Sequence, residues 1–302
     1  MELCANCVII AQDMKPPPRR IKRLVLAVAG AFLIFVMLRW FEHSQVYRPD
    51  RELVAGAAQF GRPFEDVYFK TSDGVLLNGW FFPANAGSPR PGWAVLVCHG
   101  NAGNISYRPD LAQALLETGL SVFLFDYRGY GLSKGDPSEE GTYLDAQAAH
   151  HWLEQKGIAA SNIIAYGESL GGGVASELTL RERLGGLVLQ STFSSIPDIG
   201  TELFPWLPVR WISTIKYDTC SKLPRIQIPV LVMHGRADEL IGFHHGEKIF
   251  AAANQPKLFW ELKGDHNDPI ADRAGFIEGI KRFLNMTELE LETRKPHSRS
   301  AG

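Results

Sequence analysis

The sequence is poor in cysteine and has almost no excess of charge. Four cysteines among 302 residues are too few for a disulfide scaffold. The 31 basic and 33 acidic side chains leave a formal net charge of −2, which gives no electrostatic reason to expect nucleic acid as a partner. Cys4 and Cys7 form a C-x-x-C without a second pair, so we expect no zinc site there, and lipidation is the functional alternative.

A long apolar run is present near the N-terminus. Residues 24–38 are fifteen consecutive apolar residues, which at about 1.5 Å per residue fall short of a hydrocarbon core about 30 Å thick. If the flanking cations extend to the headgroups and Trp40 and Phe41 anchor the far interface, residues 21–41 reach about 31 Å. The sequence therefore predicts a single transmembrane anchor at residues 21–41, preceded by a tail at residues 1–20.

The flanks of this run predict its fate and its orientation. A cleaved signal peptide is the competing interpretation, but Arg39-Trp40-Phe41-Glu42 is not a small-residue cleavage site, so we favour a retained anchor. Basic residues are concentrated before the run, which predicts a cytoplasmic N-terminus and a catalytic domain on the non-cytoplasmic side. Those residues are Lys15, Arg19, Arg20, Lys22 and Arg23. Met14 is an alternative start that would leave the anchor intact.

The rest of the chain alternates short apolar runs with helical patterns. A hairpin is predicted first, with strands at residues 67–70 and 75–82 around a Ser-Asp-Gly turn. Apolar runs bounded by turn residues then predict buried strands at residues 93–98, 120–125, 163–166, 187–189, 230–233 and 258–262. This alternation predicts an α/β fold with a mostly parallel central sheet and helices on both faces. We place this domain at residues 65–284, after a linker at 42–64 and before a charged tail at 285–302 that is predicted to be disordered.

The segment 193–223 is longer and more aromatic than a single crossover requires. We interpret it as a small cap over the strand ends, with an ordinary helical crossover as the alternative. Phe204, Trp206, Leu207 and Trp211 offer apolar surface with few charges, so the cap interpretation predicts that they line a pocket for an acyl chain. Packing of these side chains into the core is the opposing interpretation.

Ser169 lies in a Gly-x-Ser-x-Gly motif between a predicted strand and a predicted helix. This context favours a sharp turn that exposes the serine hydroxyl. Gly167 and Gly171 stand where a Cβ would meet neighbouring backbone, and the backbone N–H of Leu170 at the helix start would point toward an oxyanion. The motif alone also occurs by chance in glycine-rich turns, so its interpretation depends on finding a base and an acid further along the chain.

Both groups follow Ser169 at predicted strand ends. Asp238 comes after the strand at 230–233, and His266 comes after the last strand, which gives the order Ser, Asp, His that is typical of this architecture. Asp238 is favoured as the acid over the alternatives Asp198, Asp265 and Asp268. The loop His99-Gly100-Asn101-Ala102-Gly103-Asn104 follows the third strand, and the backbone N–H of Asn101 is the predicted second oxyanion donor. This chemistry needs no metal and no cofactor.

In combination, four motifs make the chain similar to a known family. The His99–Asn104 loop, Asp126-Tyr127-Arg128-Gly129-Tyr130-Gly131-Leu132-Ser133, Gly167–Gly172 and Gly264-Asp265-His266-Asn267-Asp268 resemble α/β-hydrolases of the bud-emergence-related, abhydrolase-domain type. Several members of that family carry one N-terminal anchor, and the resemblance covers roughly residues 67–284. The chain departs from the family at Gly242 in the acid loop, where a proline is commoner.

This resemblance implies a serine hydrolase with Ser169 as nucleophile, Asp238 as acid, His266 as base, and Asn101 and Leu170 as amide donors. The expected substrate is a small-molecule or lipid acyl ester or thioester. An acylated protein is a further candidate, because animal relatives include protein depalmitoylases. A serine peptidase on the same fold and a non-catalytic membrane scaffold are the alternatives. The scaffold is disfavoured by the complete triad.

Overall fold

The structure is a computed structural model that describes residues 18–294. Cys4, Cys7 and most of the predicted tail at residues 1–20 lie outside the described residues. The chain divides into two units, residues 1–46 and 47–302. In the first unit, helix α1 (Arg19–Val46) has a mean hydropathy of 2.3 over its most apolar 18 residues, and that stretch is not buried by protein. This helix is long and apolar enough to cross a membrane.

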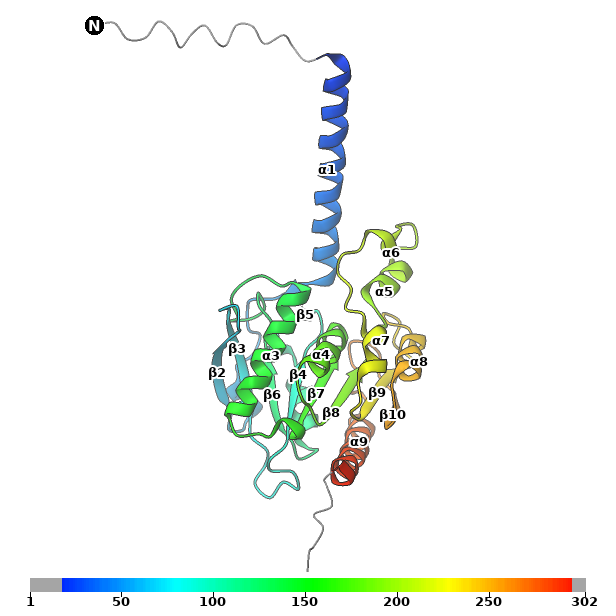
Figure 1. Cartoon of the computed structure of the whole chain (residues 1–302). Helices are drawn as coiled ribbons and strands as arrows, with labels where there is room; N and C mark the ends of the chain where they lie inside the picture. Colours follow the sequence, from blue (N-terminus) through cyan, green and yellow to red (C-terminus); the bar gives the residue numbers. More distant parts are fainter. Residues whose placement is uncertain (1–17, 295–302) are drawn as a thin grey trace, which may run out of the picture. The chain divides into compact units, whose positions relative to one another are not determined.

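The second unit is built on an eight-stranded sheet with the order β10-β9-β8-β7-β4-β6-β3-β2 (Figure 1). Every pairing along this sheet from β10 to β6 is parallel, while β3 is antiparallel to both of its neighbours, β6 and β2. The bounds are β2 (Glu65–Lys70), β3 (Leu76–Phe82), β4 (Ala94–Cys98), β6 (Ser121–Phe125), β7 (Ile163–Glu168), β8 (Gly186–Gln190), β9 (Val230–Gly235) and β10 (Lys257–Leu262). The predicted hairpin and the predicted mostly parallel sheet are both confirmed.

Helices cover both faces of the sheet. On one side α3 (Glu139–Gln155) packs beside α4 (Leu170–Arg181), which in turn contacts α7 (Thr219–Lys222), and α7 contacts α8 (Phe243–Ala252). On the other side α2 (Pro109–Leu116) packs against α9 (Arg273–Arg294). The inner strands β4, β6, β7, β8 and β9 are buried on both faces, and this explains why they appear in the sequence as continuous apolar runs.

The predicted linker at residues 42–64 is wrong in two respects. Its first residues continue α1 to Val46, and a short strand β1 (Arg48–Pro49) then pairs in parallel with β5 (Ala102–Gly103). A 3₁₀ turn, η2 (Ala57–Phe60), places Phe60 in the core, where its ring lies 4.8 Å from that of Phe82. Because two apolar side chains of η2 are buried, this segment is part of the domain.

The predicted disordered tail at residues 285–302 is also wrong as far as the described residues extend. Helix α9 continues to Arg294, with Thr287 fully buried and Met286 packed against the core. Glu288 forms an ion pair of 2.8 Å with Arg90, a residue that is itself buried. The tail was predicted from its charged composition, but one face of the helix is apolar enough to bury. Residues 295–302 lie outside the described residues.

The segment 193–223 contains features of both interpretations that the sequence left open. Helices α5 (Ile196–Leu203) and α6 (Val209–Ile212) pack on each other beyond the end of β8, as a cap would. Helix α7 contacts α4 and α8, as a crossover helix does. We call α5 and α6 together the α5–α6 cap, after which the chain returns into the helical layer through α7 (Figure 1).

Candidate active site

The predicted site residues follow the carboxyl ends of four strands of the parallel sheet. β4 and β7 are neighbours, with Cys98 opposite Gly167, so the loop that contains Asn101 and the turn that contains Ser169 start side by side. β9 and β10 are also neighbours, and they lead to Asp238 and His266 respectively. In open α/β sheets, the crevice beyond the carboxyl ends of the strands is where ligands bind.

Ser169 occupies a strained turn between β7 and α4. Its φ is +52°, a left-handed conformation that non-glycine residues rarely adopt and that is typical of functional turns. The turn is held by hydrogen bonds from Ser169 N to Gln190 O (3.0 Å) and from Thr192 Oγ1 to Ser169 O (2.6 Å). A Cβ on Gly171 would overlap the Cys98 carbonyl, so the close approach of α4 to β4 requires glycine there.

Asp238 and His266 lie in direct contact, although they are 28 residues apart. His266 Nδ1 is 2.9 Å from Asp238 Oδ2, and because a carboxylate only accepts hydrogen bonds, Nδ1 carries the proton. The other oxygen of Asp238 accepts the backbone N–H groups of Leu240 (3.1 Å) and Ile241 (2.8 Å). The Asp238 side chain is fully buried, so its orientation toward His266 is fixed, and Nε2 of His266 is left as the basic nitrogen.

Two of the three alternative acids, Asp265 and Asp198, are engaged elsewhere, and Asp268 is exposed. Asp265 Oδ1 accepts the backbone N–H groups of Asn267 and Asp268, which closes the turn that carries His266. Asp198 pairs with Lys248 at the base of the cap. Asp238 is therefore the carboxylate that the structure brings to His266, in preference to the alternatives.

The two predicted oxyanion donors, Asn101 and Leu170, both lie next to the turn that contains Ser169. Leu170 is the first residue of α4, and Asn101 follows a peptide whose carbonyl, Gly100 O, is 2.7 Å from His99 Nδ1. In a trans peptide the N–H and the carbonyl point in opposite directions. Because Gly100 O points toward buried His99, the N–H of Asn101 points away from His99. Among the described residues, Ser169 Oγ has no hydrogen bond to His266. Such contacts are often long in a substrate-free site.

Sequence comparison places this architecture in a family. An uncharacterized Mycobacterium tuberculosis protein, Rv2307c, is 39% identical over 268 residues, covering 87% of this chain and 94% of its own. Protein bem46 of Schizosaccharomyces pombe is 34% identical, covering 78% and 81%. The α/β-hydrolase domain-containing protein WAV2 of Arabidopsis thaliana is 31% identical, covering 76% and 79%. A family model described as the α/β-hydrolase fold matches residues 94–209. The chain is an α/β-hydrolase.

Solved structures of other α/β-hydrolases share the fold. The Pyrococcus furiosus esterase Pf2001 has a TM-score of 0.66 at 21% identity, covering 80% of this chain and 98% of its own. A thermophilic esterase from Thermogutta terrifontis has a TM-score of 0.57 at 19% identity, covering 74% and 99%. At these identities the likeness concerns the fold alone.

Sequence reasoning missed an ion pair beside Ser169. In this α/β-hydrolase, Arg108 Nε lies 3.2 Å from Glu168 Oε2, and Glu168 directly precedes Ser169. Arg108 also donates to the carbonyls of Asn104 and Ala102, both at 3.2 Å. Burial raises the pKa of Glu168, but the Arg108 guanidinium more than compensates and holds that pKa below its ordinary value. The charged pair thus fastens the oxyanion loop to the serine turn.

Sequence reasoning also missed the second histidine near Asp238. His234 Nε2 lies 3.5 Å from Asp238 Oδ2 and donates to Ile241 O at 2.7 Å. Burial lowers the pKa of His234, so it is neutral near pH 7 and does not neutralise the Asp238 carboxylate. His234 precedes Asp238 by four residues, so this contact is local and the short spacing is the signal that could have suggested it.

The two cap tryptophans do not line an enclosed pocket, contrary to the sequence prediction. Trp206 is 74% exposed and Trp211 is 90% exposed. Nor do they pack inward as core, which was the opposing interpretation. Phe204 and Leu207 are half-buried, and the Phe204 ring lies 6.3 Å from that of Trp206 in an edge-on arrangement. An aromatic composition identified an apolar segment, but it could not decide which way the rings face.

Two side-chain groups in the described residues have a composition that suits a metal ion, and neither includes a triad residue. One is His150, His151 and Glu154, and the other is Glu202, His244 and His245. In the second group, His245 Nδ1 accepts the backbone N–H of Ser194, so the proton is on Nε2, which donates to Glu202 and is not available as a ligand. A groove of about 980 Å³ lies at the opposite edge of the sheet, near Trp93 and Pro229, remote from Ser169.

Proposed function

We propose that this α/β-hydrolase is a membrane-anchored serine hydrolase that cleaves carboxylic ester or thioester bonds through an acyl-enzyme. The observation that carries the proposal is the contact between His266 and buried Asp238, at the same sheet edge as a serine in a strained turn. Burying a carboxylate lowers stability unless it is paired, and a buried carboxylate that orients a histidine is typical of a functional site.

The proposed chemistry uses residues of the chain alone. His266 Nε2 accepts the proton of Ser169 Oγ as the oxygen attacks the substrate carbonyl, and Asp238 stabilises the resulting imidazolium. The backbone N–H groups of Asn101 and Leu170 hold the oxyanion. The imidazolium then protonates the leaving alcohol or thiol. Water, activated by the same histidine, releases the acid from Ser169.

The names of structural neighbours favour ester substrates over amides, since several of those proteins are called esterases. Rates of hydrolysis of esters, thioesters and amides of graded chain length will identify the preferred acyl group. The same panel will show whether the leaving group is an alcohol or a thiol. We expect esters or thioesters to be hydrolysed. Hydrolysis of amides alone would favour the peptidase alternative.

The nucleophile is tested by Ser169→Ala. This change should abolish covalent labelling by a fluorophosphonate and lower turnover by up to about a millionfold, because the members of a triad act as a unit. Ser176→Ala is a matched control, since this buried serine is on the same helix and only donates to Gly172 O. Labelling that persists in Ser169→Ala refutes the assignment.

The anchor part of the proposal rests on α1 and on the basic residues around Arg19. Detergent, and not salt, should release the protein from membranes. Protease added to intact cells or spheroplasts should reach the domain after Phe41 only from the non-cytoplasmic side. Recovery of a soluble protein that lacks residues 1–40 would instead indicate a cleaved signal peptide.

A further inference from the structure

The α5–α6 cap presents its largest apolar side chains to solvent. Trp211 is 90% exposed, Trp206 is 74% exposed and Leu203 is 49% exposed. Trp206 and Trp211 are the two most exposed large apolar side chains that the structure describes outside α1, and both belong to this one short segment. Single exposed apolar residues are ordinary, but two tryptophans gathered on a cap indicate a surface that binds something.

The charges of the cap indicate what that surface binds. The two acids of the cap, Asp198 and Glu202, both lie on α5, where Asp198 pairs with Lys248 and Glu202 contacts His244 and His245. From Leu203 to Lys216, the stretch that carries both tryptophans, the ionisable side chains are Arg210 and Lys216. The Arg210 side chain is 64% exposed and pairs with Asp198 at 2.8 Å. The stretch from Leu203 to Lys216 thus combines tryptophan with basic residues, which is the composition of segments that lie in the headgroup region of an anionic bilayer.

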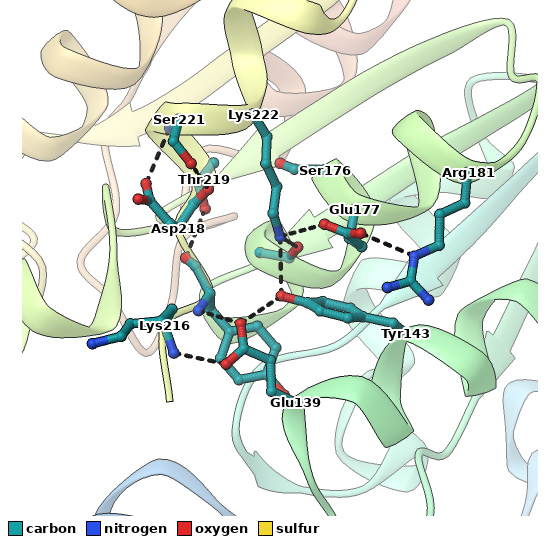
Figure 2. Close-up of polar contacts among 12 residues, drawn as sticks. Glu139, Tyr143, Ser176, Glu177, Arg181, Lys216, Asp218, Thr219, Ser221 and Lys222 are labelled. Atoms are coloured by element: carbon teal, nitrogen blue, oxygen red, sulfur yellow. Dashed lines mark hydrogen bonds and ion pairs between the residues drawn. The ribbon is translucent and has the colours of Figure 1, made fainter. Parts of the chain in front are cut away.

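The base of the cap is held firmly to the catalytic domain. Glu139 at the start of α3 accepts the backbone N–H groups of Lys216 and Tyr217, both at 2.7 Å (Figure 2). Lys222 donates to Tyr143 Oη at 3.0 Å and pairs with Glu177 at 3.0 Å. These contacts fix the segment that returns from α6, so the cap has a defined orientation on the domain.

The chain also enters the catalytic domain at this base. Tyr47, the first residue of the domain, has its hydroxyl 3.0 Å from that of Tyr217, and Arg48 N donates to Asn101 O. The predicted interfacial residue Trp40 precedes Tyr47 by seven residues, which span about 10 Å in a helix. The point of attachment, the oxyanion loop and the cap therefore share one edge of the sheet, and that attachment point is tethered within about 10 Å of the predicted bilayer interface.

We propose that the α5–α6 cap docks on the lipid surface of the membrane that α1 spans. Trp206 and Trp211 enter the headgroup region, and Arg210 and Lys216 face lipid phosphates. This inference rests on the proposed anchor, but it does not depend on the proposed chemistry. Because the cap stands at the same sheet edge as Ser169, docking places the catalytic site at the lipid surface, where the substrate is an acyl ester drawn from the membrane.

The test uses the full chain carrying Ser169→Ala, in vesicles of phosphatidylcholine and phosphatidylglycerol with lipids brominated near the top of the acyl chain. Bromine quenches tryptophan fluorescence on contact. The fluorescence of Trp206 and Trp211 is obtained as the difference between this chain and a chain in which both are changed to Phe. The fluorescence of Trp40 in α1 is obtained in the same way from Trp40→Phe. We expect the emission of the pair to be quenched by the brominated lipids, and less so when phosphatidylglycerol is omitted.

A second measurement uses active protein with Trp206 and Trp211 both changed to Ala. The ratio of its rate on a long-chain ester in vesicles to its rate on a water-soluble short ester should fall several-fold. Tyr68→Ala and Leu289→Ala, both exposed apolar residues on β2 and α9, should leave that ratio unchanged.

The outcomes separate the two proposals. Quenching of Trp40 without quenching of the cap pair overturns the docked cap and leaves the anchor intact. Absence of both signals overturns the anchor and the docked cap together. Quenching of the pair in the Ser169→Ala chain, together with a wild-type chain that hydrolyses no ester, supports the docked cap and refutes the proposed chemistry.

Discussion

Arg108 and Glu168 form an ion pair that joins the loop after β4, which contains the proposed oxyanion donor Asn101, to the residue before Ser169. Arg108 Nε is 3.2 Å from Glu168 Oε2, and its remaining nitrogens donate to two carbonyls of the loop at residues 102–104. We interpret Arg108 as a positioning residue, because it holds the backbone that is proposed to bind the oxyanion.

Arg108→Ala should therefore lower kcat by roughly ten- to a hundredfold with little change in KM, somewhat less than the loss of one oxyanion donor. Arg108→Lys should recover part of the rate, since one hydrogen bond can be re-formed. Arg273→Ala is the control, because that exposed arginine pairs with Glu117 far from Ser169. Equal effects of Arg108→Ala and Arg273→Ala on kcat would contradict the positioning role.

Asp238→Asn should preserve the fold and lower turnover by about ten thousandfold, because the amide would favour the wrong tautomer of His266. The measurement is kcat with a short ester, together with circular dichroism to verify folding. Asp265→Asn and Asp268→Asn should cost far less, as Asp265 only closes a turn. A larger loss for either of these would remove Asp238 from the acid role.

His150 should make the protein less stable in mild acid. It is buried, and its Nε2 donates to Arg183 O at 3.0 Å. Burial lowers the pKa of His150 in the folded state, although Glu154, 3.6 Å away, opposes this. Below about pH 6.5 the unfolded chain binds a proton that the folded chain resists, so the free energy of unfolding falls as pH decreases.

Thermal melting between pH 7.5 and about pH 5.5 checks this expectation. His150→Gln should flatten the dependence of Tm on pH, because glutamine can donate to Arg183 O without titrating. His151→Gln, next to it on α3 but half exposed, is the comparator. If both variants flatten the profile equally, burial of His150 is not the cause.

Glu288→Ala should destabilise the domain by about 1–3 kcal/mol, because it leaves the buried Arg90 guanidinium without its charged partner. The measurement is Tm or denaturant unfolding. Glu278→Ala removes an exposed pair with Arg282 on the same helix and should cost less than about 0.5 kcal/mol. A Glu288→Ala variant as stable as wild type would show that the ion pair with Arg90 contributes nothing to stability.

The sequence alone was sufficient for the fold class and for the order of its elements. Buried parallel strands require continuous apolar runs, and the turn at Ser169 requires glycine at Gly167 and Gly171, so both leave a pattern that can be read locally. The candidate acid and base were found for the same reason. They stand immediately after strands whose ends the pattern defines.

Contacts that join distant segments were decided only by the tertiary structure. The order of strands brings Arg108 to Glu168, which are 60 residues apart, and no spacing in the sequence encodes that contact. The high content of charged residues after Asn285 predicted disorder. In the structure, α9 continues through this region because one of its faces is apolar and packs on the core, and because Glu288 pairs with Arg90. In the cap, composition marked Trp206 and Trp211 as apolar, but their exposure depends on how α5 and α6 pack on each other.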